Sequence, residues 1–515
     1  MKKLFLLILV ISSLLLTSCS KKVTPDPIDD NYRVFYEIFT GSFSDSNGDG
    51  IGDLNGIINR LDYLNDGNID SGKSLGIQGI WLTPIFASPS YHKYDVKDYY
   101  SIDPKFGSQE DLDKLIKECH DRNIILILDM VINHTSKEHE WFKQFVKAHQ
   151  SNDTSNKYYD YYVFADNDSL PGGRRFRIIS GTNQSYECNF SDDMPELNFD
   201  NENVRNDVLE IARYYLDKGI DGFRFDAAKY VYFGDNGSSI DFWNWYCKEL
   251  KKIKEDVYLV AEVWSGEAEV NEYIKAMNCF NFSMSQAEGV IASASKGNNI
   301  NTYTSYIESY QDRLRAINRE AMMISFISNH DMDRAAGYLS VSTGLAYIGA
   351  NLNILTPGSP FIYYGEEIGM KGSRGGANTD ANRRLAMLWG DNDTVKDPEG
   401  STYELKNQIN GTVKENLDKK DSLLRHYSKL IRIRKLYPEI ARGTYTKLDL
   451  GDSSLGGFRI DYDGQTVYLI HNATDAQQTI KLNDVSKLLE SAGFDQAEFK
   501  SGELKIGPYT SALLK

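Results

Sequence analysis

The stretch SQEDLDKLIKECHDRNIILILDMVI, residues 108–132, decides the fold class. Residues 108–123 space their apolar side chains along one face of a helix, and residues 124–132 form a short apolar run rich in β-forming residues. Comparable short runs recur, separated by helical patterns, at 34–39, 77–86, 221–227, 257–264, 280–282, 323–329 and 361–367. Strands that alternate with helices indicate a parallel α/β architecture, and eight of them indicate a closed (β/α)8 TIM barrel.

Two further domains interrupt or follow this pattern. About 65 residues separate the third predicted strand from the helix that begins near Asn201, which is too long for a simple loop. We therefore predict a barrel from residues 32–134 and 201–439, with an inserted domain at 135–200. Beyond the amphipathic helix at 422–438, short alternating strands separated by turns predict an antiparallel β-sandwich at 440–515.

The N-terminus has the pattern of a secretory signal. Lys2 and Lys3 precede an apolar run at 4–16, which is shorter than the roughly 20 residues that span a bilayer. The run ends in LTSC, which resembles a bacterial lipoprotein box. We therefore expect lipidation at Cys19, a linker at 20–31, and an extracytoplasmic protein that is anchored to the membrane or cell surface. The alternative is an ordinary signal peptide, 1–19, with a chance cysteine.

Composition narrows the partners. The 515 residues are 41% hydrophobic and 25% charged, as in an ordinary globular protein. A net charge of −16 argues against a nucleic-acid partner, because phosphate contacts need clustered Lys and Arg. The other four cysteines lie far apart and suit neither a zinc site nor a dense disulfide framework. We expect a monomer.

Polar residues follow several predicted strands at the end where a barrel carries its active site. Arg224 and Asp226 lie two apart on one strand and so share a face. Glu262 and Asp331 end two later strands. The residues expected to surround these carboxylates are His134, His330 and, after the second strand, His92, Tyr94 and Asp95. Each alone has an ordinary structural role; their joint placement indicates a site.

This set of side chains has a definite chemical use. Neighbouring carboxylates separate their pKa values, so that one ionises as a nucleophile while another stays protonated as an acid. Hydrolysis of a glycosidic bond with retention requires such a pair. An arginine beside the nucleophile would keep it ionised, and histidines could bind sugar hydroxyls.

Six sequence blocks resemble the alpha-amylase family, glycoside hydrolase family 13. They are YHKYDVKDYYSIDPKFGS (91–108), DMVINH (129–134), MPELN (194–198), GFRFDAAKY (222–230), AEVW (261–264) and SNHD (328–331). The match spans nearly all of residues 32–515 in family order. It implies a barrel, domain A, with domain B inserted after the third strand and a β-sandwich domain C.

The resemblance also implies roles for individual residues. Asp226 would be the nucleophile, Glu262 the general acid/base, and Asp331 the carboxylate that holds sugar hydroxyls. His92, His134, Arg224 and His330 would line one sugar subsite, and Tyr94 would stack on the ring. Tyr230 departs from the histidine that helps many family members to hold a calcium between domains A and B, so we assign no ligands there.

The expected reaction is cleavage of internal α-1,4 bonds in starch, glycogen or maltooligosaccharides. Ala227 and Ala228 after the nucleophile resemble members that act on α-1,4 links, and MPELN resembles the subfamily intermediate between oligo-1,6-glucosidases and neopullulanases. One alternative is an α-glucosidase or transglycosylase acting on short glucans. Another, of a different class, is a non-catalytic starch-binding or transporter-partner lipoprotein.

The stretch DSNGDGIGD, residues 45–53, begins like an EF-hand calcium loop. An EF-hand needs a glutamate at its twelfth position, where this chain has Gly56, and a helix before the loop, where this chain has a strand pattern. A sensor is therefore excluded. A structural Ca²⁺ held by Asp45, Asn47, Asp49, the Ile51 carbonyl and Asp53 is expected, as the resemblance also implies; the alternative is a solvated turn.

Overall fold

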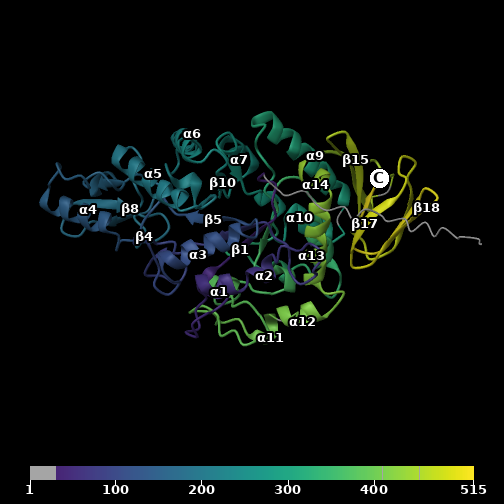
Figure 1. Cartoon of the computed structure of the whole chain (residues 1–515). Helices are drawn as coiled ribbons and strands as arrows, with labels where there is room; N and C mark the ends of the chain where they lie inside the picture. The colour runs from purple at the N-terminus through teal and green to yellow at the C-terminus, as the bar shows by residue number, and fades with distance from the viewer. Residues whose placement is uncertain (1–29, 298, 409, 452) are drawn as a thin grey trace, which may run out of the picture.

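A seven-stranded parallel sheet forms most of the barrel (Figure 1). The computed structural model describes residues 30–297, 299–408, 410–451 and 453–515. The sheet order is β11-β10-β9-β5-β2-β1-β12, and each neighbouring pair is parallel. The strands are β1 (Phe35–Ile38), β2 (Gly79–Leu82), β5 (Ile125–Met130), β9 (Gly222–Phe225), β10 (Tyr258–Ala261), β11 (Asn278–Cys279) and β12 (Phe361–Tyr363).

The barrel closes through an irregular segment between β11 and β12. The strand predicted at 323–329 forms no ladder; it makes one parallel bridge, Phe280 to Ile324. Its backbone nevertheless bonds both neighbours, because Asn281 N donates to Ile324 O at 2.9 Å and Phe361 N donates to Ser325 O at 2.7 Å. The strand predicted at 280–282 is also displaced: β11 ends at Cys279, and a 3-10 turn, η4, spans Phe282–Met284.

Aromatic packing inside the barrel explains the irregularity. Phe280 and Phe282 place their rings 5.4 Å and 5.3 Å from that of Phe326. They belong to a buried cluster that fills the barrel interior with Phe35, Trp81, Ile127, Tyr258, Val260, Met322, Ile324, Met332 and Phe361. Bulky rings at these positions favour a filled core over regular strand pairing.

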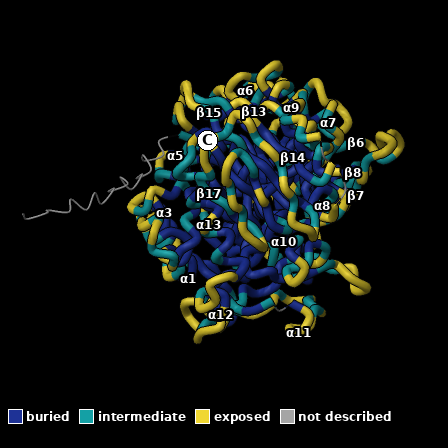
Figure 2. Tube along the Cα trace, turned by 90° about the vertical axis from the view of Figure 1, so that its right-hand side faces the viewer, coloured by how far each residue is buried: buried dark blue, intermediate teal, exposed yellow. Residues whose placement is uncertain are grey.

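Amphipathic helices cover the outside of the sheet. In α3 (Gln109–His120), Ser108 and Asp111 form a capping box, and the buried side is Leu112, Leu115, Ile116 and Cys119. The other helices of the barrel region are α1 (Leu54–Asn59), α2 (Leu61–Leu64), α5 (Glu202–Asp217), α6 (Asn236–Ile253), α7 (Glu267–Tyr273), α8 (Val290–Ser295), α9 (Ile300–Ile317), α10 (Leu345–Ile354), α11 (Leu405–Gln408), α12 (Val413–Asp418), α13 (Leu423–Leu436) and α14 (Pro438–Arg442). Figure 2 shows buried chain in the interior and exposed chain at the periphery.

Residues 135–200 add a helix and a small sheet beside the barrel, and their buried side chains, such as Phe142 and Tyr162, share one core cluster with it. They contain α4 (Glu140–Ser151) and an antiparallel sheet of β6 (Phe164–Asp166), β8 (Gln184–Glu187) and β7 (Phe176–Ile178), in that order. A bridge from His134 to Glu196 and a hydrogen bond from Leu197 N to Asn133 O, at 3.0 Å, attach this segment to the end of β5. Nearby, the two-stranded sheet of β3 (Phe86–Ala87) and β4 (Asp98–Ile102) follows β2.

Two antiparallel sheets form the C-terminal part. One has the order β13-β14-β15-β20-β17 and the other β16-β19-β18. Residues from both sheets, including Leu455, Ile470, Leu504 and Ile506, share one buried cluster. The strands are β13 (Thr444–Lys447), β14 (Leu455–Tyr462), β15 (Gln465–Asn472), β16 (Gln478–Lys481), β17 (Leu488–Gly493), β18 (Ala497–Lys500), β19 (Glu503–Ile506) and β20 (Thr510–Leu514).

The beginning of the described chain is held by the fold. Asp30, placed in the linker by the sequence, pairs with Arg442 at 2.7 Å, so the folded protein includes this end of the predicted linker. The predicted signal peptide and Cys19 lie outside the described residues. Within the described part, every helix is too short or too polar to cross a membrane. Cys119, Cys188, Cys247 and Cys279 are buried free thiols.

Candidate active site

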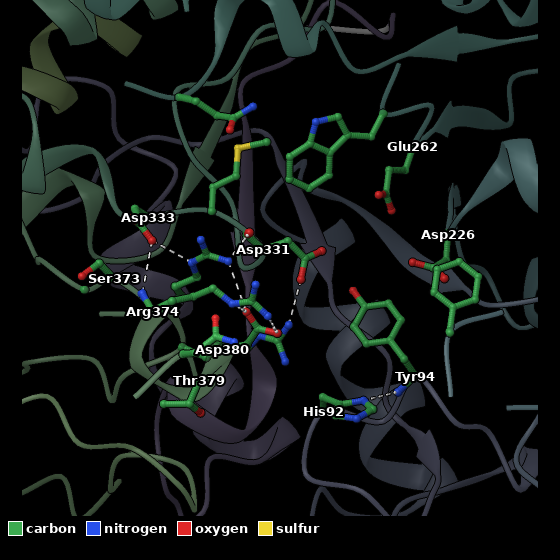
Figure 3. Close-up of a pocket in the computed structure, with 18 of the residues that line it drawn as sticks. His92, Tyr94, Asp226, Glu262, Asp331, Asp333, Ser373, Arg374, Thr379 and Asp380 are labelled. Carbon is green, nitrogen blue, oxygen red and sulfur yellow. Dashed lines mark hydrogen bonds and ion pairs between the residues drawn. The ribbon is translucent and has the colours of Figure 1, made fainter. Parts of the chain in front are cut away.

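A cavity of about 1360 Å³ opens at the carboxyl ends of the barrel strands. Asp226 and Glu262, which directly follow β9 and β10, line it together with Asp331. Figure 3 shows Asp226 and Glu262 on one side of Asp331, and Asp333, Arg374 and Asp380 on the other. Parallel neighbouring strands bring their ends to one edge, which explains why residues distant in sequence meet here.

Arg224 pairs with two of the three carboxylates that line the cavity, Asp226 and Glu262. Its Nη1 lies 2.7 Å from Asp226 Oδ1, and its Nη2 contacts Glu262 Oε2. The guanidinium is 1% exposed and does not line the cavity. One buried cation therefore sets the spacing of the two carboxyl groups, and retaining glycosidases need a spacing of about 5 to 5.5 Å.

Asp129 is a further carboxylate that pairs with Arg224, through the same nitrogen that contacts Asp226. Its carboxylate oxygens lie 2.9 and 3.1 Å from Arg224 Nη1, and it also accepts hydrogen bonds from Trp81 and Tyr94. Burial raises the pKa of Asp129, and Arg224 opposes this rise. The ion pair with a third, buried carboxylate fixes Arg224 in place beneath the reacting groups.

Glu262 has the pKa of a general acid. Burial raises it, Arg224 lowers it, and the nearby charges of Asp226 and Asp331 raise it again, to about 7. A carboxyl group with this pKa carries its proton at mildly acidic pH and can return to the base form near neutrality. The backbone after the nucleophile is in the left-handed region, with φ 48° at Ala227, which turns the chain away immediately beyond Asp226.

Asp331 is held in its ionised form from two sides. Its Oδ2 lies 3.0 Å from His330 Nε2, and its Oδ1 lies 2.8 Å from Arg384 Nη2. Burial opposes the negative charge, but His330 and Arg384 together hold the pKa of Asp331 well below its usual range. Asp331 therefore offers acceptor oxygens and no proton to a sugar.

His330 lies behind the cavity wall as a charged support. Its Nδ1 is 2.6 Å from Glu37 Oε1 on β1. Burial disfavours its charge, yet Asp331 and Glu37 raise the pKa of His330 to about 10. The imidazolium can therefore donate from both nitrogens, and Tyr94 OH, 2.6 Å from His330 Nε2, passes a hydrogen bond on to Asp129.

The turn between β3 and β4 carries His92 and Tyr94, and His134, which follows β5, bonds to this turn. The Tyr94 ring stacks on His330 with centroids 5.4 Å apart and lines the cavity. His92 Nδ1 accepts from Tyr94 N at 3.1 Å, and His134 Nε2 donates to Tyr94 O at 3.2 Å. Burial lowers the pKa of both histidines, that of His92 to about 4, so both are neutral hydrogen-bonding groups.

Asp95 lies apart from these lining residues. It is buried and does not line the cavity. Its Oδ1 accepts hydrogen bonds from the hydroxyls of Ser88, at 2.7 Å, and Ser90. Ser90 also lies 3.2 Å from His92 Nδ1. The structure therefore places Asp95 as a support for the His92 turn, whereas the sequence assigns it to substrate contact.

Several residues of the site escape sequence reasoning. Arg383 Nη1 donates to Asp331 O at 2.7 Å, and Arg384 Nη1 donates to Tyr91 OH at 3.0 Å. Neither belongs to a predicted element. Glu37 could have been noticed, because a lone acid inside the buried strand β1 must find a partner.

A carboxylate pair and a third acid at the mouth of a (β/α)8 barrel define a glycoside hydrolase. Residues 37–443 match the family described as alpha amylase, catalytic domain. The chain belongs to the alpha-amylase family and is an enzyme that acts on α-glucans.

Individual relatives agree with this assignment. The chain is 34% identical to Alpha-amylase 3 of Dictyoglomus thermophilum over 94% of this chain and 93% of that protein. Its fold matches the structure of Eubacterium rectale Amy13B with a TM-score of 0.89 and 36% identity, over 96% and 97% of the two chains. It is also 30% identical to a 4-alpha-glucanotransferase of Thermotoga neapolitana, over 87% and 97%. The family is thus shown, while its members differ in the reaction that they complete.

Proposed function

We propose that this enzyme hydrolyses internal α-1,4-glucosidic bonds of starch, glycogen or maltooligosaccharides with retention of configuration. The observation that carries the proposal is the contact of Arg224 with both Asp226 and Glu262, combined with the raised pKa of Glu262. One carboxylate is stabilised as an anion beside a second group that can hold a proton.

In the first step, the Asp226 carboxylate attacks the anomeric carbon and forms an ester bond to it. The bond from that carbon to the glycosidic oxygen breaks, and Glu262 donates its proton to the departing oxygen. Asp331 and the histidines accept or donate hydrogen bonds to sugar hydroxyls as positive charge develops on the ring. The Tyr94 ring lies against the sugar.

In the second step, water occupies the place of the departed chain. The Glu262 carboxylate removes its proton, the water oxygen attacks the anomeric carbon, and the bond to Asp226 breaks. Glu262 is again protonated and Asp226 again an anion, so the enzyme returns to its starting state. Two inversions at one carbon give net retention.

Cavity size supports internal cleavage. Small-ligand pockets commonly enclose about 300–1,000 Å³, and this cavity encloses about 1360 Å³. The lining extends from Asp226 and Glu262 past Asp331 to Arg374 and Asp380, so the cavity has room for several glucose units.

Product analysis tests the proposal. We expect rapid loss of viscosity of soluble starch with a mixture of short products, slower attack on maltotriose, and no cleavage of isomaltose. Glucose as the sole product would support the α-glucosidase alternative, and products longer than the substrate would support transglycosylation, as the glucanotransferase relative suggests.

We also propose a structural Ca²⁺ in the loop at 45–53. Asp45 Oδ2 accepts from Gly50 N at 2.7 Å and Asp49 Oδ1 accepts from Ile51 N at 2.8 Å, so both side chains fold back over the loop. Asp53 accepts from Gly56 N through Oδ1 and from Ser46 N and Oγ through Oδ2, so a cation would share its carboxylate with these donors. Among the described residues, no three His, Cys, Asp or Glu side chains are arranged to hold a metal, and Asp45, Asp49 and Asp53 are no exception. The proposal therefore rests on their spacing in the sequence, with Asn47 and the Ile51 carbonyl as further oxygen ligands.

The location of the enzyme is a further proposal. A lipid on Cys19 would tether a monomeric enzyme outside the cytoplasm, where polymeric glucans are accessible. The support is the residue pattern at 2–19.

A further inference from the structure

A second cavity, of about 380 Å³, lies outside the active site. Its walls come from the start of β4 and from the turn that leads into α4, and none of its residues lines the catalytic cavity. Figure 1 places β4 and α4 at the end of the molecule opposite the C-terminal sheets. We call this cavity the α4 groove; its residues are Lys97, Asp98, Tyr99, Tyr100, Glu138, His139, Glu140, Trp141 and Lys143.

The floor of the α4 groove is aromatic and rigid. The Trp141 ring lies 4.4 Å from that of His139 and 6.1 Å from that of Tyr99. Tyr99 is buried and donates its hydroxyl inward to Val131 O at 2.7 Å, so the phenol oxygen does not reach the groove as a free donor. His139 accepts from Trp141 N as the cap of α4, and burial lowers its pKa to about 4, which leaves the ring neutral.

The rim carries charged groups that the fold leaves free. Lys97, Glu138 and Lys143 are exposed, and no hydrogen bond or ion pair to another described residue engages their charged ends. Tyr100 is 46% exposed beside them. Side chains of this kind at the edge of an aromatic floor can bond a ligand that lies flat on the rings.

The chemistry of the α4 groove excludes several ligand classes. Asp98, Glu138 and Glu140 outnumber Lys97 and Lys143, so an anion such as a phosphate would be repelled. The described residues hold no His, Cys, Asp or Glu cluster fit for a metal ion. A purely apolar ligand would make no use of the charged ends of Lys97, Glu138 and Lys143, which are exposed to water. A neutral polyhydroxyl ligand satisfies both the floor and the rim.

We propose that the α4 groove is a second glucan-binding site, which holds one or two glucose units of a polymeric substrate by stacking on Trp141. The proposal rests on the proposed function, because the same chain that enters the active site would supply the ligand. Binding at two places on one enzyme raises the effective concentration of polymer at the catalytic cavity. A substrate too short to reach both places gains nothing.

Two variants remove the groove in different ways. Trp141→Ala removes the stacking surface, and a triple variant, Lys97→Ala with Glu138→Ala and Lys143→Ala, removes the rim charges without touching the core. Phe494→Ala is the matched control, since Phe494 is 50% exposed and lies on the loop after β17, far from the groove in sequence and fold. Melting temperatures establish that each variant is folded.

Kinetics on two substrates give the first test. For Trp141→Ala we expect the starch concentration at half-maximal rate to rise by about fivefold to tenfold, the change expected for the loss of one aromatic contact. The kcat/KM for maltotriose should equal that of wild type, and the triple variant should show a smaller change in the same direction. Wild-type starch kinetics in both variants would overturn the proposal, as would an equal loss on starch and maltotriose.

A binding test separates this proposal from the proposed function. Asp226→Asn protein, whose catalytic cavity is the same in every variant compared, is mixed with insoluble starch granules, and the fraction that sediments is measured. We expect Trp141→Ala in this background to sediment less than its parent, and Phe494→Ala to sediment equally. Equal sedimentation of all three would refute the groove even if starch is hydrolysed. Failure of wild type to hydrolyse starch would refute the proposed function and leave the sedimentation result to decide the groove.

Discussion

Arg384 binds the side chain of Asp331 and the backbone carbonyl of the residue before it, His330. Its Nη2 lies 2.8 Å from Asp331 Oδ1, and its Nε donates to His330 O at 3.1 Å. The guanidinium is buried and also bonds Tyr91. The position of Asp331 therefore depends on a residue 53 positions further along the chain, which with His330 also stabilises its charge.

Replacing Arg384 should disturb Asp331 in a measurable way. In Arg384→Gln the opposite charge is lost, and the pKa of Asp331 should rise. We expect kcat/KM for maltooligosaccharides to fall by about tenfold to hundredfold, because a carboxylate that binds the sugar is misplaced. The acidic limb of the pH profile of kcat/KM should move to higher pH.

Two controls define the cause of this change. Arg384→Lys keeps the charge and should preserve the acidic limb better than Arg384→Gln. Arg374→Gln alters an exposed arginine of the same segment, which pairs with Asp380 and not with Asp331, and should leave the limb in place. A pH profile of Arg384→Gln that superimposes on that of wild type would contradict the assigned role.

The pKa of Glu262 predicts the basic limb of activity. Because the general acid must hold its proton for the first step, kcat/KM should fall as the pH rises above about 7, the value to which burial raises the pKa of Glu262. Glu262→Gln should abolish this limb together with nearly all activity. Stopped assays from pH 4 to 9 give the profile, and a rate that is constant up to about pH 9 would be inconsistent with Glu262 as the acid.

The same shift predicts a stability effect. The folded pKa of Glu262 lies above the ordinary value of about 4.3, so its contribution is fully present below that pH and is lost as the pH rises through about 7. Glu262→Gln, which never ionises, should therefore melt at a higher temperature than wild type at pH 8 and at a similar one at pH 4. The surface variant Glu255→Gln should show no such divergence.

Strand-end chemistry was predictable because it depends on local patterns. Apolar runs flanked by helical periodicity locate β5, β9 and β10, and a parallel barrel forces Asp226 and Glu262 to one mouth. The way in which the barrel closes could not be predicted, because the segment at 323–327 takes the place of a strand and bonds both neighbours without regular pairing. The conformation of this segment depends on aromatic rings from three distant segments that fill the barrel interior. The periodicity of apolar residues in the sequence gives no information on such contacts.

The supporting residues were less predictable for a related reason. Glu37 contacts His330, which lies 293 positions further along the chain. Arg383 and Arg384 lie at the end of a short 3-10 helix, η7 (Asp380–Arg383), whose sequence has no helical or strand pattern. Their positions follow from ion pairs such as Arg383 with Asp333, at 2.8 Å, which form only in the folded chain. For Asp95 the sequence predicts substrate contact, which stays a prediction, and the structure adds its hydrogen bond from the Ser88 hydroxyl.

Asp226→Asn should separate an enzyme from a binding protein. The variant loses the nucleophile but keeps a side chain of equal size, and Arg224 keeps its pairs with Asp129 and Glu262. We expect hydrolysis of starch to fall by several orders of magnitude while the protein still sediments with starch granules. Equal hydrolysis by the variant and wild type would assign the observed activity to a contaminant and favour the non-catalytic alternative.

Cys19→Ser should release the protein from the membrane. Lipidation attaches the chain through the cysteine sulfur, and serine offers no thiol for that bond. In cells that process lipoproteins, wild type should fractionate with membranes and the variant should appear in a fraction free of membrane. Wild type that is found only in the soluble fraction would favour the ordinary signal peptide.

Chelation should lower the melting temperature without removing the active site. A cation bound by the loop at 45–53 would stabilise the folded state alone and so raise its melting temperature. The loop is attached to a second segment, because Thr394 Oγ1 donates to Asp45 Oδ2 at 2.6 Å and Lys396 N donates to Gly50 O at 2.9 Å. The catalytic carboxylates contact neither segment, so activity well below the melting temperature should persist.

Asp49→Ala provides the matched variant for this test. Its carboxylate accepts one hydrogen bond, from Ile51 N, among the described residues, so its loss costs little when no metal is bound. We expect the variant to melt below wild type in Ca²⁺ and at the same temperature as wild type in chelator, with about one Ca²⁺ per chain in purified wild type. Metal-free wild type whose melting is indifferent to chelator would refute the calcium site and leave the loop as a hydrogen-bonded turn.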